Sequence, residues 1–567
     1  MTNNLDVKNV FTILVTLLFL VAPFNPLPNV AGQGFNLSYN ISIWFIVTLI
    51  IGTGLYLISK RRCFEYPASY SYLIIFLFLI VLASFLAGSN QPIVRLFRLA
   101  YIVGGVAFLF SLFQFRVNTK QINKVLYLLV IVAFIDSIIT IIQNIPRAGG
   151  IFRQVNVEAS FLATGLLIAI YLISRPPFRK VGLLTKVIFL TTIASATYVI
   201  TLSGSRIGLL SMLLGGCILL VCRRKQFARQ KYILVMMLMI ISISLFLGSS
   251  GLERVIVKTS QETESGGGSQ LEYKSVRLTM YAISLNLVKQ EPVFGHGIGS
   301  FLRVWASETE KFHKENPNSV LDDTSTTHPH NELLFWFIEG GVISIIAIII
   351  GIGGVVVGLF NCGVERGGAY VAMLLPISLH TQVELPFYNS SLHWFVWLFL
   401  VFVVLRHNSR AKALEVSQSA LVTIRMTAII LCVFISYFLF QITLAQRDIY
   451  KFLYDDNNKP PYLKTALQNP YFRPLAEKLA MKSLLYNAIE NRNNKNVLIY
   501  IAWAELEMET MPEKMLFTDL IKAYGYLNME SKLCSVTRKA LNIYSDIKLT
   551  KIESDLCALQ IKGVRLD

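Results

Sequence analysis

The sequence predicts an all-α polytopic membrane protein with about 12 to 13 transmembrane helices, a large outer loop and a C-terminal helical tail domain. Hydrophobic residues make up 54% of the 567-residue chain and charged residues only 15%, which is unlike a soluble globular protein. Apolar runs of about 20 residues, long enough to cross a hydrocarbon core as a helix, recur up to about residue 444. Basic residues gather in the short loops between these runs.

The apolar runs define the expected spans one by one. The first run is expected to be a retained span and not a signal peptide. Lys8 is the only basic residue before it, and Pro23, Pro26 and Pro28 follow it. The expected spans are 10–28, 41–59, 70–87, 93–113, 124–143, 157–174, 183–202, 206–222, 231–248, 331–360, 368–382, 392–405 and 422–444.

Charge in the loops predicts the topology. Alternate loops are strongly basic, and these are Lys60–Arg62, Arg116–Lys124, Arg175–Lys186, Arg223–Lys231 and Arg406–Lys412. Positive loops face the cytoplasm, so the N-terminus is expected inside and the 249–330 loop outside. An odd number of spans then puts the tail outside as well. Because the excess of positive charge lies in these loops, the net charge of +18 does not indicate nucleic-acid binding.

This topology divides the chain into four expected regions. They are an N-terminal transmembrane bundle (1–248), a large periplasmic loop (249–330), C-terminal transmembrane helices (331–445) and a periplasmic helical tail (446–567). In the loop, Val276, Met280, Ile283, Leu287 and Val288 recur at helical spacing and predict an amphipathic helix. The tail has helical patterning between about 474 and 545.

Ionisable and polar residues cluster where the outer loop enters the span at 331. The stretch contains His328, His330 and Asn331, groups that a hydrophobic helix does not need and that are costly at membrane depth. One interpretation is a polar helix cap. The other is that one neutral imidazole serves as a general base near neutral pH. Glu332, Glu339 and Glu384 are candidates to orient it or ordinary polar lining.

Two arginines are expected on the same outer side. Arg206 begins a span after Ser203-Gly204-Ser205, and Arg277 lies at the start of the amphipathic helix. An arginine near the end of a span is often a lipid-facing anchor. Both, however, oppose the positive-inside bias, which favours an anionic ligand, and guanidinium groups donate to phosphate oxygens in fixed bidentate geometry.

No metal or other cofactor is expected, because the histidines at i, i+2 do not share a helix face and no Asp-x-Asp or other metal-spaced cluster occurs. Cys534 and Cys557 share the tail that topology puts in the oxidising compartment, so we predict a disulfide between them.

Several motifs together resemble the O-antigen ligase and polymerase superfamily, and within it the pilin-type O-oligosaccharyltransferases (PglL/PilO type). His330 is followed by Gly341 as in the family's H-(x10)-G signature. The other matching stretches are Thr327–Leu333, Gln382–Tyr388, Arg153–Asn156, Ser203–Gly208 and Glu291–Gly299. Val155 departs from the family, whose members usually have proline in a Gln-Pro-Asn motif.

The resemblance implies a metal-independent, inverting glycosyltransferase in the bacterial inner membrane with a periplasmic active site. The donor would be an undecaprenyl-diphosphate-linked oligosaccharide, with its lipid chain in an apolar groove between spans, and the acceptor a Ser or Thr hydroxyl of a pilin or another periplasmic or outer-membrane protein. Arg206 and Arg277 would bind the diphosphate, and His330 would be the catalytic base. The supporting site residues would be His328, Asn331, Glu384, Gln154 and Asn156.

Three alternatives stay open. An O-antigen ligase would use the same donor and transfer the glycan to lipid A–core, and a glycan polymerase would transfer it to another glycan. The large tail and the Gln382–Phe387 stretch favour a protein acceptor. From a different class, a transporter or flippase of lipid-linked glycan is disfavoured because the polar groups gather at one face and not at the midplane.

Overall fold

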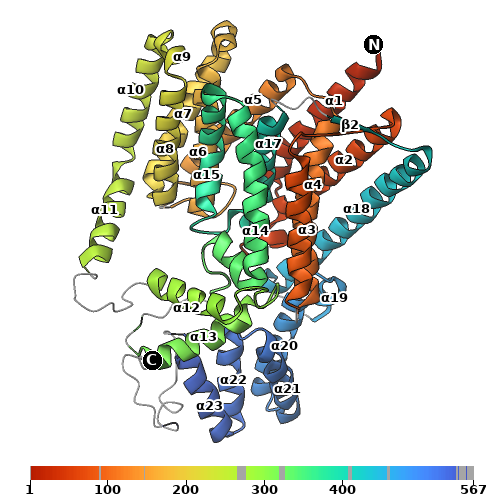
Figure 1. The fold of residues 1–567 in the computed structure, drawn as a ribbon. Coiled ribbons are helices and arrows are strands. Elements are labelled where there is room, and N and C mark those ends of the chain that lie inside the picture. The colour runs from red at the N-terminus through yellow and green to blue at the C-terminus, as the bar shows by residue number, and fades with distance from the viewer. Residues whose placement is uncertain are drawn as a thin grey trace. The chain divides into compact units, whose positions relative to one another are not determined.

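A computed structural model of the chain describes residues 2–88, 91–145, 147–264, 276–317, 319, 326–406, 412–455, 460–544, 547 and 557. These residues are mostly helical, with two short strands among them (Figure 1). They form two compact units whose positions relative to one another are not determined. Unit 1 contains Met1–Leu77, Ala100–Ser260 and Ile348–Tyr450, and unit 2 contains Phe78–Leu99, Gln261–Ala347 and Lys451–Asp567.

The fold class predicted from the sequence is confirmed: the chain is an all-α polytopic membrane protein. Within the described ranges, eight helices are long and apolar enough to cross a membrane. The first is Val7–Phe24, built from α1 (Thr2–Thr16), η1 (Leu17–Val21) and η2 (Ala22–Phe24). The others are α2 (Ser38–Arg61), α4 (Pro92–Gln114), α5 (Thr119–Gln143), α6 (Val155–Ile173), α7 (Leu183–Ser203), α14 (Glu332–Asn361) and α18 (Gln418–Tyr454).

The remaining expected spans correspond to shorter helices. Of the described helices, eight, or up to nine if one bent pair is a single span, are long and apolar enough for a full crossing. The shorter helices are α3 (Tyr70–Leu86), α8 (Arg206–Cys222), α10 (Lys231–Leu247), α15 (Val364–His380) and α17 (Ser391–Arg406). At 16 or 17 residues each, these helices are only about 25 Å long, against ~30 Å of hydrocarbon.

The bent pair is α10 with α11 (Ser249–Glu264), where the helix axis turns by 61° at Gly248. The predicted outer loop therefore begins as a helix. The turn brings α11 against the end of α7: a Cβ on Gly251 would lie 1.9 Å from the carbonyl oxygen of Thr201. Only glycine permits so close an approach between the two backbones.

Helix α6 is the centre of unit 1. It packs against α5, α7, α8 and α15, and every residue from Val157 to Ile173 is buried. A helix that is apolar on all sides is stable only when other helices surround it. Short helical turns complete the connections within the chain: η3 (Gly34–Asn36), η4 (Pro176–Lys180), α9 (Arg224–Ala228), α16 (Pro386–Asn389), η5 (Pro460–Leu463) and α19 (Lys464–Gln468).

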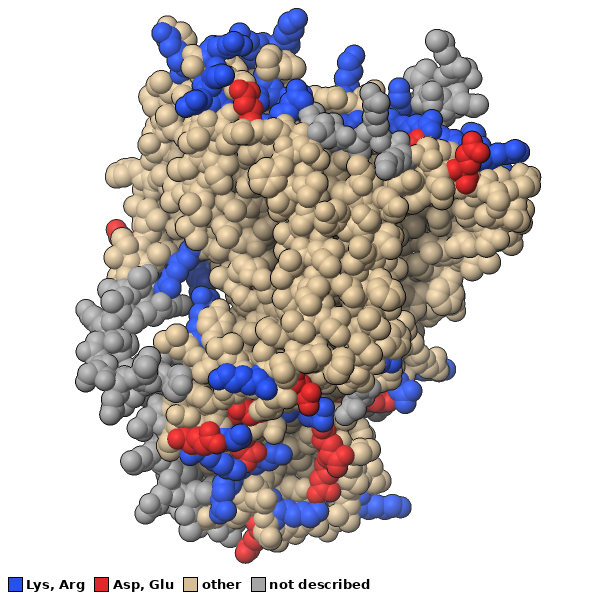
Figure 2. Space-filling view, viewed as in Figure 1, with Lys and Arg blue, Asp and Glu red and all other residues tan. Residues whose placement is uncertain are grey.

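The basic loops of unit 1 lie together at one end of its helices, as the sequence predicted. Lys and Arg side chains gather at the end that carries α9 (Figure 2). Arg406 donates to the Val117 carbonyl at 2.6 Å, and Arg179 to the Arg229 carbonyl at 3.0 Å. A two-stranded antiparallel sheet, not foreseen from the sequence, also joins two of these loops: β1 (Cys63–Tyr66) pairs with β2 (Lys412–Glu415).

Unit 2 contains the predicted amphipathic helix, which is α12 (Val276–Gln290). Its face of Met280, Ile283, Leu287 and Val288 is buried, and it packs against α13 (Phe301–Glu315). Whether α12 lies on a membrane surface stays a prediction.

The tail of unit 2 forms two helical hairpins, α20 (Arg473–Glu490) with α21 (Asn494–Thr510), and α22 (Lys514–Tyr526) with α23 (Glu530–Leu541). The helical patterning predicted between about 474 and 545 is confirmed. The short loops make each pair antiparallel neighbours. Ala306 of α13 belongs to the apolar core of these hairpins, and Cys534 is disulfide-bonded to Cys557, with Cα atoms 5.3 Å apart.

Candidate functional site

The polar stretch before α14 contains two imidazoles that are in contact. The N–H of His330 donates to Nδ1 of His328 at 3.2 Å, and the ring centroids are 4.4 Å apart. His330 has a φ of +50°, in the left-handed region that histidine tolerates better than most residues. Asn331 is the helix cap, because its side-chain oxygen accepts the Leu334 N–H at 2.9 Å. The cap role thus belongs to Asn331, and both histidines are half-buried in front of it.

Helix α14 is broken nine residues after it begins. Gly341 has φ +61° and ψ −165°, which are not helical angles. The glycine loop that follows α12 packs into this break, with the Gly297 N–H donating to the Glu339 carbonyl at 2.9 Å. A Cβ on Gly341 would lie 2.1 Å from the Val293 carbonyl oxygen. Glycine is therefore required at this position, eleven residues after His330, for a backbone reason.

A buried ion pair holds the same region of unit 2. The carboxylate of Glu339 pairs with Arg98 and accepts the backbone N–H groups of Gly299 at 3.1 Å and Phe301 at 3.2 Å. The Arg98 guanidinium lies over the Phe335 ring, 4.1 Å from its centroid. Such stacking stabilises a buried cation. Glu339 therefore secures the break in α14, a role more specific than the two that the sequence suggests for it, orienting the histidine or lining the site.

Arg277, the fourth predicted site residue of unit 2, is exposed in the first turn of α12. A cation at a helix N-terminus faces the positive end of the helix dipole, which is unfavourable unless an anion is also present. An anion bound beside the exposed guanidinium would offset this unfavourable charge.

Unit 1 contains a second group of predicted site residues, centred on Glu384 in the turn after α15. The Glu384 carboxylate accepts the Gln154 amide at 2.8 Å and the Asn156 amide at 2.9 Å. The Gln154 side-chain oxygen in turn accepts the amide of Asn389 at 2.6 Å. Gln154 precedes α6 and Asn156 lies in its first turn, so the start of α6 is bound to the turn between α15 and α16. We call Gln154, Asn156 and Glu384 the carboxylate cluster.

Arg206 follows directly from this cluster along the chain. Ser205, the N-cap of α8, accepts the Gly208 N–H at 3.2 Å and donates its hydroxyl to the Asn156 side-chain oxygen at 2.8 Å. Arg206 is the first residue of α8 and is half-buried. Free N–H groups and the helix dipole make a helix N-terminus favourable for phosphate, and a guanidinium there adds formal positive charge.

The structure thus brings the predicted residues together in two groups. The carboxylate cluster and Arg206 belong to unit 1, and His328, His330, Asn331 and Arg277 belong to unit 2. In unit 1, sequence reasoning missed His380, which contacts Glu384 at 3.2 Å. The spacing of His380 and Glu384 indicates this contact, because residues four apart share a helix face. Glu384, however, lies in the turn after α15, where helical spacing is not expected. Among the residues whose placement is known, no cluster of three potential metal ligands occurs.

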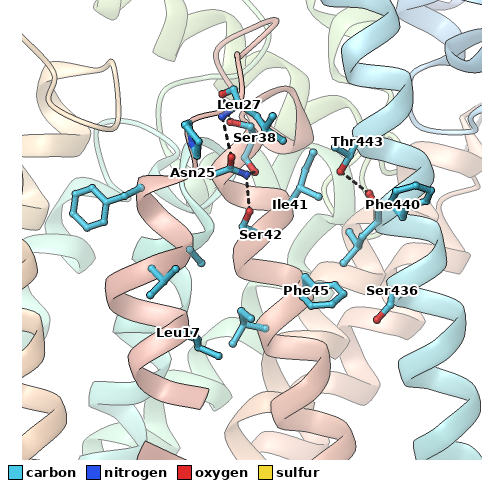
Figure 3. A pocket seen from close by; sticks show the side chains of 16 residues that line it. Leu17, Asn25, Leu27, Ser38, Ile41, Ser42, Phe45, Ser436, Phe440 and Thr443 are labelled. Atoms are coloured by element: carbon cyan, nitrogen blue, oxygen red, sulfur yellow. Dashed lines mark hydrogen bonds between the residues drawn. The ribbon is translucent and has the colours of Figure 1, made fainter. Parts of the chain in front are cut away.

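Unit 1 also contains an apolar pocket between the first span, α2 and α18 (Figure 3). Its volume is about 500 Å³, within the range of ligand-binding pockets. Asn25 donates to the Ser42 hydroxyl at 2.6 Å and gathers with Leu27 and Ser38 at one end, while Leu17 and Phe45 lie toward the other (Figure 3). The remaining lining residues are Val21, Ala22, Phe24, Pro26, Ile41, Ile46, Ser436, Leu439, Phe440 and Thr443.

The pocket is connected to the carboxylate cluster through the start of α2. Ser38 lines the pocket, and the next residue, Tyr39, donates its hydroxyl to the Asn389 carbonyl at 3.0 Å. Asn389 also donates to Gln154 at 2.6 Å. An apolar cavity and a polar cluster are therefore held together within unit 1.

Comparison with known proteins gives three family matches. The family of O-antigen ligases matches residues 190–349, the range that contains Arg206, Arg277 and His330. The family described as virulence factor membrane-bound polymerase, C-terminal, matches residues 369–548. The protein glycosylation ligase family matches residues 148–173, which include Gln154 and Asn156. No curated protein matches the chain.

Proposed function

We propose that this chain, a member of the superfamily of O-antigen ligases and protein glycosylation ligases, transfers an oligosaccharide en bloc from undecaprenyl diphosphate to a Ser or Thr hydroxyl of a pilin-like or other periplasmic protein. The families matched support glycosyl transfer in general. The observation that carries the proposal is that the protein glycosylation ligase match covers Gln154 and Asn156, both of which bind Glu384.

In the proposed reaction Arg206 and Arg277 bind the donor diphosphate. Guanidinium groups keep their charge at any biological pH and suit phosphate oxygens. They would also stabilise the charge that grows on the diphosphate as the bond from the anomeric carbon to its oxygen breaks. Each arginine is near a helix N-terminus, where an anion is also favoured by the helix dipole.

His330 is the proposed general base. As the acceptor hydroxyl oxygen attacks the anomeric carbon, its proton passes to the His330 imidazole, and the electron pair of the broken bond leaves with the diphosphate. A single displacement of this kind inverts the configuration at the anomeric carbon. The carboxylate cluster would support sugar binding, and His328 would orient His330 through the contact between their rings.

The apolar pocket of unit 1 is the proposed site for part of the donor's polyprenyl chain. Its walls come from helices that are apolar and long enough to span a membrane, so an occupant from the bilayer is a hydrocarbon chain. The link from Tyr39 through Asn389 to Gln154 supports a donor whose lipid and polar parts both bind unit 1.

The proposed location is the bacterial inner membrane, with the active site and tail in the periplasm. The Cys534–Cys557 disulfide fits an oxidising compartment. A membrane-impermeant thiol reagent, applied to intact spheroplasts after reduction, tests this: labelling of the tail cysteines is expected, and protection of both until lysis would contradict it.

Expression of the chain beside a lipid-linked glycan pathway and a pilin-like acceptor, in a host without its own ligase, tests the reaction. The intact mass of the acceptor should gain one glycan with the wild type and none with His330→Ala, Arg206→Ala or Arg277→Ala. His313→Ala on α13 and Lys289→Ala on α12 are matched controls that should retain transfer.

The same experiment separates the alternatives. Glycan found on lipid A–core, with the acceptor protein unmodified, would move the assignment to an O-antigen ligase, whose family also matches. Transfer that persists in His330→Ala at equal expression would remove the general-base role. A lipid-linked glycan that changes membrane leaflet without being transferred would favour a transporter.

A further inference from the structure

Behind Glu384, three buried polar side chains form a hydrogen-bonded series inside unit 1. His380 Nε2 lies 3.2 Å from the Glu384 carboxylate. His380 Nδ1 lies 2.8 Å from the Ser160 hydroxyl, which lies 3.2 Å from Nε2 of His393. Ser160, His380 and His393 are each fully excluded from solvent. Buried polar groups of this kind are retained when every donor has a partner.

The far end of the series has its proton fixed. His393 Nε2 lies 2.9 Å from the carbonyl oxygen of Val157, and a carbonyl can only accept. Nε2 of His393 therefore carries the proton. Its Nδ1 is buried with no hydrogen-bond partner, which is tolerable for a lone pair but costly for an N–H.

The near end is fixed in the same way. An ionised Glu384 can only accept, so His380 must present an Nε2–H to it. A neutral His380 then has a lone pair on Nδ1. The Ser160 hydroxyl lies 2.8 Å from that nitrogen and 3.0 Å from the Val157 carbonyl. Because that carbonyl already accepts from His393, the single hydroxyl proton of Ser160 can be donated to His380. The opposite tautomer of His380 would direct a lone pair at the carboxylate.

We propose that His380, held in its Nε2–H tautomer by Ser160, is the positioning residue of the carboxylate cluster. It holds one oxygen of Glu384, and the carboxylate then fixes which way the Gln154 and Asn156 amides face. Their NH₂ groups donate to Glu384, and the Asn156 oxygen accepts from Ser205, the residue before Arg206. The proposal rests on the proposed function, in which the cluster supports donor binding.

The decisive test is a double-mutant cycle on kcat/KM for glycan transfer. His380→Gln keeps an Nε2 donor for Glu384. A glutamine amide has no tautomers, so the direction of this hydrogen bond no longer depends on the Ser160 hydroxyl. Ser160→Ala should lower kcat/KM about tenfold in the wild-type background. The same change should have little effect in the His380→Gln background, and His380→Phe should lose most activity.

A purely structural role predicts a different result, because the cavity left by Ser160→Ala would cost the same in both backgrounds. Equal losses in the two backgrounds would therefore overturn the proposal, as would full activity of Ser160→Ala alone. Ser137→Ala is the matched control, since Ser137 is equally buried and bonds Ser195 at 2.6 Å away from the cluster.

A second readout does not depend on activity. In ¹⁵N-histidine spectra of the whole protein, the resonance assigned to His380 by its absence in His380→Gln should show a neutral ring with the proton on Nε2. Ser160→Ala should change that signal. A proton on Nδ1, or no change in Ser160→Ala, would overturn the positioning role. A wild-type chain with no transfer to any acceptor would instead contradict the proposed function and leave this test intact.

Discussion

Arg98 and Glu339 form a buried ion pair within unit 2, although they are 241 residues apart in the sequence. Arg98 lies on α4 and Glu339 on α14, both apolar enough to span a membrane. A buried ion pair contributes little more to stability than two apolar side chains of similar size would. Loss of one partner, however, leaves an isolated charge in a medium that cannot solvate it.

We therefore expect Glu339→Ala to destabilise the protein by about 3 to 5 kcal/mol. The substitution would leave Arg98 unpaired and also remove the acceptor of the Gly299 N–H. Thermal unfolding in detergent measures the effect. Lys314→Ala, which removes an exposed pair with Glu310, is the control and should cost less than about 1 kcal/mol. Similar losses for the two variants would contradict this account.

Gly341→Ala should be strongly destabilising and should abolish transfer. The new methyl group would lie 2.1 Å from the Val293 carbonyl oxygen, at a φ of +61°, so the glycine loop would have to leave the break in α14. Gly216→Ala provides the contrast, because no atom lies within 4 Å of its Cβ position. A helical Gly→Ala change of that kind should be neutral or stabilise by up to about 1 kcal/mol. Normal activity of Gly341→Ala would refute the steric argument.

A larger side chain in the apolar pocket should weaken binding of long-chain donors. Ser436→Phe places a ring in the pocket, whereas Val433→Phe changes an exposed position on the same helix. We expect Ser436→Phe to raise KM for a long polyprenyl donor about tenfold, equivalent to roughly 1.4 kcal/mol of binding. A short-chain donor should be affected little. An equal rise for both donors, or for both variants, would exclude this pocket as the site of the lipid chain.

Asp519 in the tail should make stability depend on pH. Burial raises the pKa of its carboxyl above the usual value, although Lys482 and the Tyr486 hydroxyl oppose the shift. Because the pKa of Asp519 is higher in the folded than in the unfolded state, its protonated carboxyl contributes to stability. This contribution is fully present below the unfolded-state pKa and is lost as pH rises through the folded-state pKa. Asp519→Asn should therefore melt at a higher temperature than the wild type near neutral pH. The difference should disappear below about pH 4, and a difference that grows in acid would contradict the assignment.

Apolar run length and loop charge are enough to predict the helices and the common end of the basic loops. These features depend on local composition, which each segment carries by itself. The spacing of Met280, Ile283 and Leu287 likewise predicts α12. Several helices extend beyond the expected apolar runs, among them α5 and α18, because polar residues at their ends continue the helix.

Contacts between distant segments could not be predicted in this way. Nothing in the sequence around Arg98 identifies Glu339 as its partner, and Gly341 alone does not reveal the loop that fills the break. The motifs indicate one part of the carboxylate cluster, namely Gln154, Asn156 and Glu384. They do not indicate His380 and Ser160, because the role of these two residues depends on α15 packing against α6.

The small sheet of unit 1 has a consequence for biogenesis. Strand β2 pairs with β1 although roughly 350 residues separate them. Helix α18 then packs on α2 so closely that a Cβ on Gly52 would lie 2.1 Å from the Cys432 sulfur. At usual synthesis rates, the partner strand emerges roughly 20 to 70 s after the first. During most of translation, one side of α2 must therefore be covered by lipid or by an insertase. The part of the chain that covers this side in the folded protein is synthesised only later.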